Sequence, residues 1–236
     1  MSAMFEEIDY VETPLGAISL RRRRVLALGR DVHEVMLGDE HLMSSLFTEG
    51  EIALTTLGLA AVDAPALDVV VGGLGLGYTA RAALDDPRTR SVVVIEAMAP
   101  VIDWHRRGLV PLGAGLAADP RCELVCGDFF AMMGEGGAAA PLVHAVLLDI
   151  DHSPRAVLNA GNAAFYTVAG LKGVAARLVV GGVFALWSDE APEPGFEAVM
   201  AAVFDHCEAH VVEFDNPLTG GRSSCTIYVG RAGAPT

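Results

Sequence analysis

The sequence predicts an α/β protein with a doubly wound, seven-stranded, mostly parallel sheet and a small β piece at its N-terminus. From residue 67 onward, apolar runs of strand length alternate with segments of helical periodicity, which is typical of a parallel sheet built from βαβ units. The last two apolar runs, residues 209–214 and 224–230, are separated by a loop too short for a crossover helix. We therefore expect them to form an antiparallel pair at one edge of the sheet.

The first sixty residues follow another pattern. Residues 16–24 and 31–38 read as short strands of a small antiparallel piece, and residues 43–60 read as a helix. Thr48 with Glu51 three residues later indicates a capping box at the start of this helix. The segment from Asp63 to Pro65 then interrupts the chain, so we place a boundary between residues 62 and 63.

The remaining elements follow in order from the alternating pattern. The expected strands are residues 67–72, 91–96, 122–126, 144–150 and 181–187, before the terminal pair. The expected helices are residues 77–84, 98–107, a short one after Asp128, 163–177 and 195–206.

Composition restricts the class of partner. The chain has 236 residues, with 16 basic and 30 acidic side chains and a net charge of −14, which repels nucleic acid and anionic membranes and attracts a cationic small molecule. No apolar run is long enough for a membrane span, and the acidic N-terminus lacks the features of a secretory signal, so we expect a cytoplasmic protein. The four cysteines show no zinc-ribbon or redox spacing, and we expect no metal site.

Four glycines lie in six positions between the first strand of the repeating pattern and its helix. Gly72, Gly73, Gly75 and Gly77 can adopt positive φ and present no Cβ, so a ligand can lie against the backbone at the start of a helix. Glycines also serve tight turns and close helix–sheet packing. From this stretch alone, both interpretations stand.

Acidic residues follow the next three strands at the edge where a doubly wound sheet binds its ligand. They are Glu96, Asp128, and the pair Asp149 and Asp151. Any one of them could be a helix N-cap, but their coincidence at one edge indicates a site. Glu96 suits the two ribose hydroxyls of a nucleoside, and Asp128 with Phe129 suits an adenine ring.

At this point the chain resembles the spermidine synthase family of the class I S-adenosylmethionine-dependent transferases. The resemblance spans nearly the whole chain and is carried by "VVVGGLGLG", "VVVIEAMAPVIDW", "DPRCELVCGDFF", "HAVLLDIDHSP", "FYTVAGLKGVAARLVVGGVFALW" and a closing β hairpin. It implies the class I methyltransferase fold, with residues 1–62 as a small strand-and-helix segment and residues 63–236 as a Rossmann-like nucleoside-binding catalytic domain. It also implies a sulfonium nucleoside donor, with Glu96 on the ribose and Asp128 on the adenine. Together with the high apolar content and the apolar helix of residues 51–60, which needs covering, the resemblance predicts a homodimer.

Two departures from the family pattern bear on the reaction. Gly75 stands where spermidine synthases usually carry an aspartate that would repel the carboxylate of intact S-adenosylmethionine, so methyl transfer becomes plausible. In "DIDHSP", the first acid is retained as Asp149, where it can receive the ammonium group of the donor, while His152 occupies the position of the general base. His152, or failing it Asp151, would take the proton of a small amine acceptor.

Three functions therefore remain open from the sequence. The favoured one is methyl transfer from S-adenosylmethionine to an amine. The second is aminopropyl transfer from decarboxylated S-adenosylmethionine to a polyamine. The third is a protein that binds the nucleoside without catalysis, since a fold does not dictate function.

Overall fold

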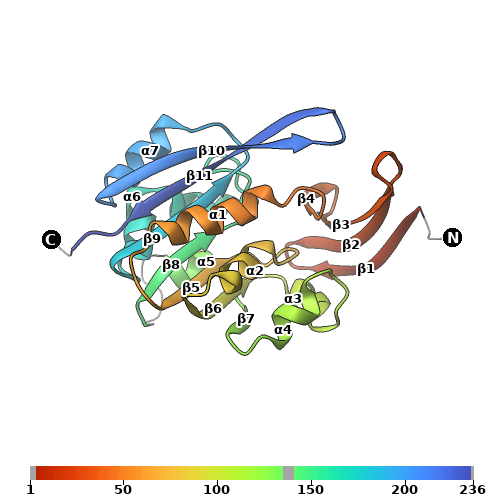
Figure 1. Cartoon of the computed structure of the whole chain (residues 1–236), viewed down its shortest axis with the longest axis horizontal. Coiled ribbons are helices and arrows are strands. Elements are labelled where there is room, and N and C mark those ends of the chain that lie inside the picture. Colours follow the sequence, from red (N-terminus) through yellow and green to blue (C-terminus); the bar gives the residue numbers. More distant parts are fainter. Residues whose placement is uncertain (1–3, 135–140, 235–236) are drawn as a thin grey trace.

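The computed structural model describes residues 4–134 and 141–234, and it contains two β-sheets (Figure 1). The smaller sheet is antiparallel, with its four strands in sequence order: β1 (Phe5–Thr13), β2 (Gly16–Val25), β3 (Arg30–Leu37) and β4 (Glu40–Ser44). The larger sheet has seven strands: β5 (Leu67–Gly72), β6 (Thr89–Glu96), β7 (Cys122–Cys126), β8 (Val143–Leu148), β9 (Leu178–Ser188), β10 (His206–Asn216) and β11 (Gly221–Arg231). This architecture confirms the predicted fold class.

The larger sheet reverses its direction of growth beside β5. Its strand order is β10-β11-β9-β8-β5-β6-β7, so the chain first builds outward through β6 to β7 and then returns to place β8 on the other side of β5. The pairs among β5, β6, β7, β8 and β9 are parallel. Strand β11 is antiparallel to both β9 and β10, which confirms the predicted terminal pair. Ligands of such sheets bind at the carboxyl ends of the strands, where the order reverses.

Helices cover both faces of the larger sheet, because its central strands are apolar on both sides. One face packs against α1 (Glu49–Ala60), α2 (Tyr78–Asp85), α3 (Ala99–Arg106) and α4 (Gly113–Ala118). The other packs against α5 (Phe129–Met133), α6 (Val168–Ala175) and α7 (Pro194–Ala201). Along β5, the buried Val69 and Val71 join the first layer and Val70 joins the second. Among the residues described, no helix is long and apolar enough to cross a membrane.

The smaller sheet has four strands where the sequence predicts two. Its second strand contains Arg21–Arg24, and each of these arginines pairs with an acid on a neighbouring strand: Glu7, Glu6, Glu34 and Asp31, respectively. These ion pairs neutralise the charges of the basic run Arg21–Arg24. In Figure 1 this sheet lies at one end of the larger one.

The start of α1 differs from the expected capping box. The backbone N–H of Thr48 donates to Glu49, 2.9 Å away, so Glu51 is not the capping acid. The helix begins at Glu49 because residues 43 and 44 belong to β4. The helix packs on α2 and on strands β8, β9 and β11 of the larger sheet. The boundary after residue 62 stays a prediction.

Two other helices are shorter than expected, and one was not predicted. The predicted helix 163–177 is divided into a 3-10 turn (Ala160–Tyr166) and α6, because Thr167 leaves the helical conformation and its hydroxyl accepts the N–H of Gly170 as an N-cap. The predicted helix 195–206 ends at Ala201, and His206 already belongs to β10. Helix α4 carries few of the large apolar residues that reveal helical periodicity.

Candidate functional site

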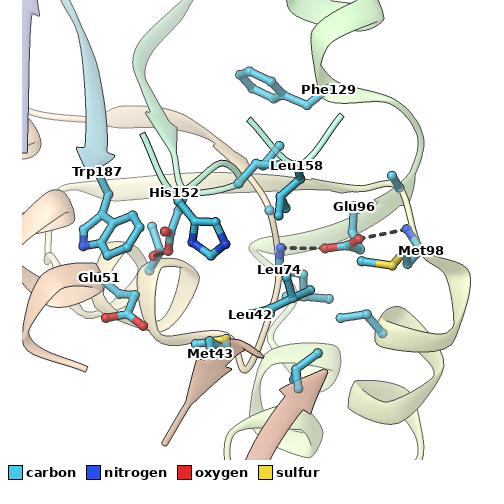
Figure 2. A pocket seen from close by; sticks show the side chains of 18 of the residues that line it. Leu42, Met43, Glu51, Leu74, Glu96, Met98, Phe129, His152, Leu158 and Trp187 are labelled. Carbon is cyan, nitrogen blue, oxygen red and sulfur yellow. Dashed lines mark hydrogen bonds between the residues drawn. The ribbon is translucent and has the colours of Figure 1, made fainter. Parts of the chain in front are cut away.

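A cavity of about 750 Å³ opens at the carboxyl ends of the parallel strands. Its floor is the glycine turn after β5 and the ends of β6, β7, β8 and β9, and its cover comes from β3, β4, the start of α1 and the terminal hairpin. Figure 2 shows Leu42 and Met43 from the N-terminal segment facing Leu74 and His152. The small sheet therefore completes a site that the larger sheet begins.

The glycine turn lies against this cavity. Gly73 and Gly75 line it, whereas the structure places Gly72 and Gly77 behind it. Gly73, Gly75 and Gly77 all have positive φ, at 91°, 47° and 91°. A Cβ on Gly72 would lie 2.6 Å from the ring of Phe129, so this glycine serves close packing. Gly73 and Gly75 therefore fit the ligand-binding interpretation of the glycine cluster, whereas Gly72 fits the close-packing interpretation.

Gly75 also leaves room for a side chain of the N-terminal sheet. A Cβ at this position would overlap the sulfur of Met43, which itself lies 2.9 Å from the N–H of Leu76. Met43 therefore occupies the space into which a side chain at position 75 would project. A residue with a Cβ at position 75 would therefore be strained by the left-handed backbone conformation and would find no free space for its side chain.

Glu96 lies at the end of β6, as predicted, and its side chain is buried beside the glycine turn. One carboxylate oxygen accepts the N–H of Leu74 at 2.9 Å, and the other accepts the N–H of Met98 at 2.8 Å (Figure 2). Burial raises the pKa of Glu96, and these backbone donors oppose that shift. Each oxygen retains a lone pair, so the carboxylate can still accept two hydroxyl groups.

Asp128 and Phe129 follow β7, and the structure separates their roles. Asp128 is the N-cap of α5, and its Oδ1 accepts the N–H groups of Phe130 and Ala131 at 2.9 and 3.2 Å. Its Oδ2 and the N–H of Phe129, at the first helical position, remain available for a ligand. The ring of Phe129 is 2% exposed and packs edge-on against the rings of Phe130 and Phe165. The ring therefore packs in the core beside the cavity that Phe129 also lines, and its covering a base stays a prediction.

Asp149 lies at the carboxyl end of β8 and lines the cavity. Its Oδ2 accepts the hydroxyl of Thr79 at 2.9 Å, and burial raises its pKa to about 6. The hydroxyl of Thr79 thus fixes the carboxylate at the junction between the glycine turn and α2.

Asp151, in contrast, points out of the cavity. It is 1% exposed and accepts hydrogen bonds from the N–H of Leu158, the amide of Asn162 and the hydroxyl of Tyr166 at 2.7 to 3.1 Å. These donors satisfy the carboxylate and tie the loop after β8 to the segment that follows it. Asp151 does not lie where it could take a proton from a bound acceptor.

His152 lies in the cavity between two carboxylates. Its Nε2 is 2.9 Å from Glu40 at the start of β4, and its Nδ1 is 4.0 Å from Asp189, which follows β9. Because a carboxylate only accepts, the Nε2 atom carries a proton toward Glu40. The lone pair on Nδ1 is then the basic position of the neutral ring.

Glu51 lines this cavity although the sequence did not assign it to the site, and the same holds for Trp187 and Asp189. Glu51 lies in the first turn of α1 and lines the cavity with Asp149 and Trp187. Burial, and to a lesser degree the charge of Asp149, raises the pKa of Glu51 to about 8. Its signal in the sequence is that the eleven residues after it carry no charge, so it is the last charged side chain of an otherwise apolar helix.

Comparison with solved structures identifies the fold to which this geometry belongs. The spermidine synthase from Thermotoga maritima shares 16% sequence identity, with a TM-score of 0.70, over 97% of this chain and 73% of its own. A spermidine synthase in complex with the transition state analogue AdoDATO shares 17%, with a TM-score of 0.72, over 97% of this chain and 74% of its own. Human methyltransferase-like protein 13 in complex with SAH shares 20%, with a TM-score of 0.61, over 80% of this chain and 84% of its own.

These similarities define the class of fold. The chain has the class I methyltransferase fold, and its N-terminal antiparallel sheet makes it spermidine synthase-like in architecture. No protein-family model matches the sequence. No curated protein matches it either.

Proposed function

We propose that the protein is a transferase that moves a methyl group from S-adenosylmethionine to a small amine. The observation that carries this proposal is one continuous cavity, which joins Glu96 and Asp128 at one end to Asp149 and His152 at the other. A nucleoside bound at the first pair would present its sulfonium toward the second pair. The fold shared with transferases of both kinds supports a group-transfer reaction.

The nucleoside end of the cavity supplies complementary groups. Glu96 would accept both ribose hydroxyls, and Asp128 Oδ2 with the Phe129 N–H would pair with the adenine edge. Met98 and Leu158 line the same cavity and would provide apolar surface for the base (Figure 2).

The preference for the intact donor follows from Gly75. No acid projects from the glycine turn, and Met43 fills the adjoining space. A donor carboxylate would therefore meet no fixed charge at this point, while Asp149 would receive the donor ammonium. Both features favour a zwitterionic amino acid group.

His152 is the proposed base. In the transfer, the acceptor nitrogen forms a bond to the methyl carbon as the carbon–sulfur bond breaks, and the sulfonium becomes a neutral thioether. The nitrogen then loses a proton, which Nδ1 of His152 would accept while Glu40 holds Nε2. Asp151 is not proposed as a base, because three donors already satisfy it.

Aminopropyl transfer is the second candidate. It is supported by the additional acid Glu51 beside Asp149, because two carboxyl groups suit an amine without a carboxylate. The discriminating experiment incubates the protein with a panel of amines and either donor and identifies products by mass spectrometry. Methylated amine with S-adenosylhomocysteine supports our proposal, whereas aminopropylated amine with methylthioadenosine overturns it. Tight donor binding without turnover on any amine would favour the third candidate, a binding protein without catalysis.

The remaining partner assignments rest on surface properties. The net charge of −14 favours a cationic small molecule over nucleic acid. The apolar helix that suggested a homodimer is covered only in part within the chain. Leu54 and Leu59 are buried and Gly58 packs against Leu147 and Ala185, but Ile52 is 44% exposed. A homodimer therefore remains a prediction.

A further inference from the structure

We propose that Glu51, together with Asp149, forms a binding site for a ligand ammonium group that releases a proton when it is filled. This inference rests on the proposed function, because the ammonium it would bind belongs to the amino acid part of the donor nucleoside. Glu51 would then set ligand specificity from α1, on the side of the cavity opposite the nucleoside groups.

Tight packing places Glu51 in the cavity. The preceding residue, Gly50, touches the indole of Trp187 so closely that a Cβ there would overlap the Nε1 atom, and it would lie 3.2 Å from the sulfur of Cys225. The first turn of α1 is thus pressed against the ends of β9 and β11. In Figure 2, Glu51 lies below Trp187 and faces the same space as His152.

The ionisable groups whose charges couple to Glu51 are acids or weak acids. They are Asp149 at the end of β8, Tyr78 on α2, Cys225 on β11 and the exposed Glu49 on the same helix. His41 on β4 lines the same cavity, as do His152 and Asp189 from the loops after β8 and β9. The apolar rings of Trp187 and Phe214 also line it, so water screens these charges incompletely.

Two carboxyl groups in such a space cannot both ionise at low cost without a cation. Burial and Asp149 raise the pKa of Glu51 to about 8, so Glu51 is neutral near pH 7 while Asp149, with a pKa raised by burial to about 6, is mostly ionised. A bound ammonium would stabilise both carboxylates, and the proton of Glu51 would leave for the solvent. The affinity of an ammonium ligand should therefore rise with pH below about 8, by about tenfold per pH unit for one linked proton.

Calorimetric titration tests this linkage. S-adenosylmethionine and methylthioadenosine, which lacks the amino group, are titrated at pH 6.5 in two buffers of different ionisation enthalpy. At this pH an α-amino group, with a reference pKa of about 7.7 to 8.0, is already charged. We expect close to one proton released per S-adenosylmethionine bound and none per methylthioadenosine. Glu51→Gln should remove most of the release and weaken S-adenosylmethionine binding by about tenfold or more, while the affinity for methylthioadenosine changes by less than about twofold.

Glu49→Gln is the matched control, because it removes a charge from the same helical turn but Glu49 is exposed outside the cavity. It should release nearly as many protons as the unmodified protein, because the charge of Glu49 is the smallest of the influences on the pKa of Glu51. The inference is overturned if Glu51→Gln releases as many protons as the unmodified protein, or if it weakens both ligands equally. If methylthioadenosine binds and S-adenosylmethionine binds without releasing a proton, the inference is overturned but the proposed function is not. Failure of both ligands to bind the unmodified protein overturns the proposed function as well.

Discussion

The Nε2 atom of His105 lies 2.9 Å from the carbonyl oxygen of Gly75 and holds the glycine turn from behind. The ring is fully buried on α3, and its Nδ1 has no hydrogen-bond partner among the described residues. Because a carbonyl only accepts, Nε2 carries the proton. Burial lowers the pKa of His105, so the ring is neutral at physiological pH. A residue remote from the ligand thus fixes the backbone against which the ligand would lie.

His105→Phe removes the donor and keeps a ring. We expect a loss of about 1 to 3 kcal/mol in unfolding free energy, because the Gly75 carbonyl loses its buried partner. The folded pKa of His105 lies below the unfolded value, so the stability that this residue contributes is present above pH 6.5 and is lost as the pH falls through the folded pKa. Urea unfolding at pH 7.5 and 5.5 measures both effects. An equal loss of stability on acidification in the variant would contradict this role of His105.

Glu96→Gln tests the ribose site with less damage than truncation, since an alanine would leave the N–H groups of Leu74 and Met98 without acceptors. We expect donor binding to weaken by about 1.5 to 3 kcal/mol, the range for hydrogen bonds to a charged group. Calorimetry with S-adenosylmethionine measures it, and Glu123→Gln, at an exposed position of the neighbouring strand β7, is the control. Unchanged affinity in a folded Glu96→Gln variant would remove Glu96 from the site.

The adjacent residues Asp151 and His152 should respond in opposite ways. Asp151→Asn disrupts the acceptor of three donors, and we expect it to lower the melting temperature. His152→Gln removes a partly exposed ring, so stability should change little while transfer to an amine falls by about 10²- to 10⁴-fold. Thermal unfolding and a product assay separate the two. Full activity in His152→Gln would reject it as the base.

Gly75→Ala should weaken donor binding for two reasons that a second substitution separates. The methyl group would meet Met43, and φ of 47° is unfavourable for any residue with a Cβ. The additional substitution Met43→Ala should restore the part of the donor affinity that is lost to the steric overlap. A loss of about 1 kcal/mol in binding free energy, which comes from the backbone conformation, should remain. Calorimetry on the single and double variants measures this. No recovery in the double variant would show that Met43 is not the obstacle. An aspartate at position 75 would meet the same obstacles, so it cannot test donor choice cleanly.

The sequence predicts the order and type of the elements from residue 67 onward because buried parallel strands are continuous apolar runs. It also locates Glu96, Asp128 and Asp149, because the carboxyl ends of those strands share one edge. The sequence does not predict the direction in which each of these side chains points. Asp151 and His152 are neighbours, yet one anchors a loop and the other enters the cavity.

Tertiary packing explains the other differences. Glu51 fits the spacing of a capping box, but Glu49 accepts the Thr48 N–H, and the contact of Gly50 with Trp187 turns Glu51 into the cavity. Phe129 follows an acid at the ligand edge, but its ring fills the space left by Gly72. The contacts of Gly50 with Trp187 and of Gly72 with Phe129 join residues that lie far apart in the sequence, so no local sequence pattern reveals them.

The relative affinity of the unmodified protein for intact and decarboxylated S-adenosylmethionine tests the central claim most directly. Calorimetry of both donors under one set of conditions gives the ratio without knowledge of the acceptor. With Gly75 in the glycine turn, no fixed negative charge faces the donor carboxylate there, so the intact donor should bind at least as tightly as the decarboxylated one. A preference for decarboxylated S-adenosylmethionine of about tenfold or more, equivalent to about 1.4 kcal/mol, would contradict methyl transfer and establish the aminopropyl donor in its place.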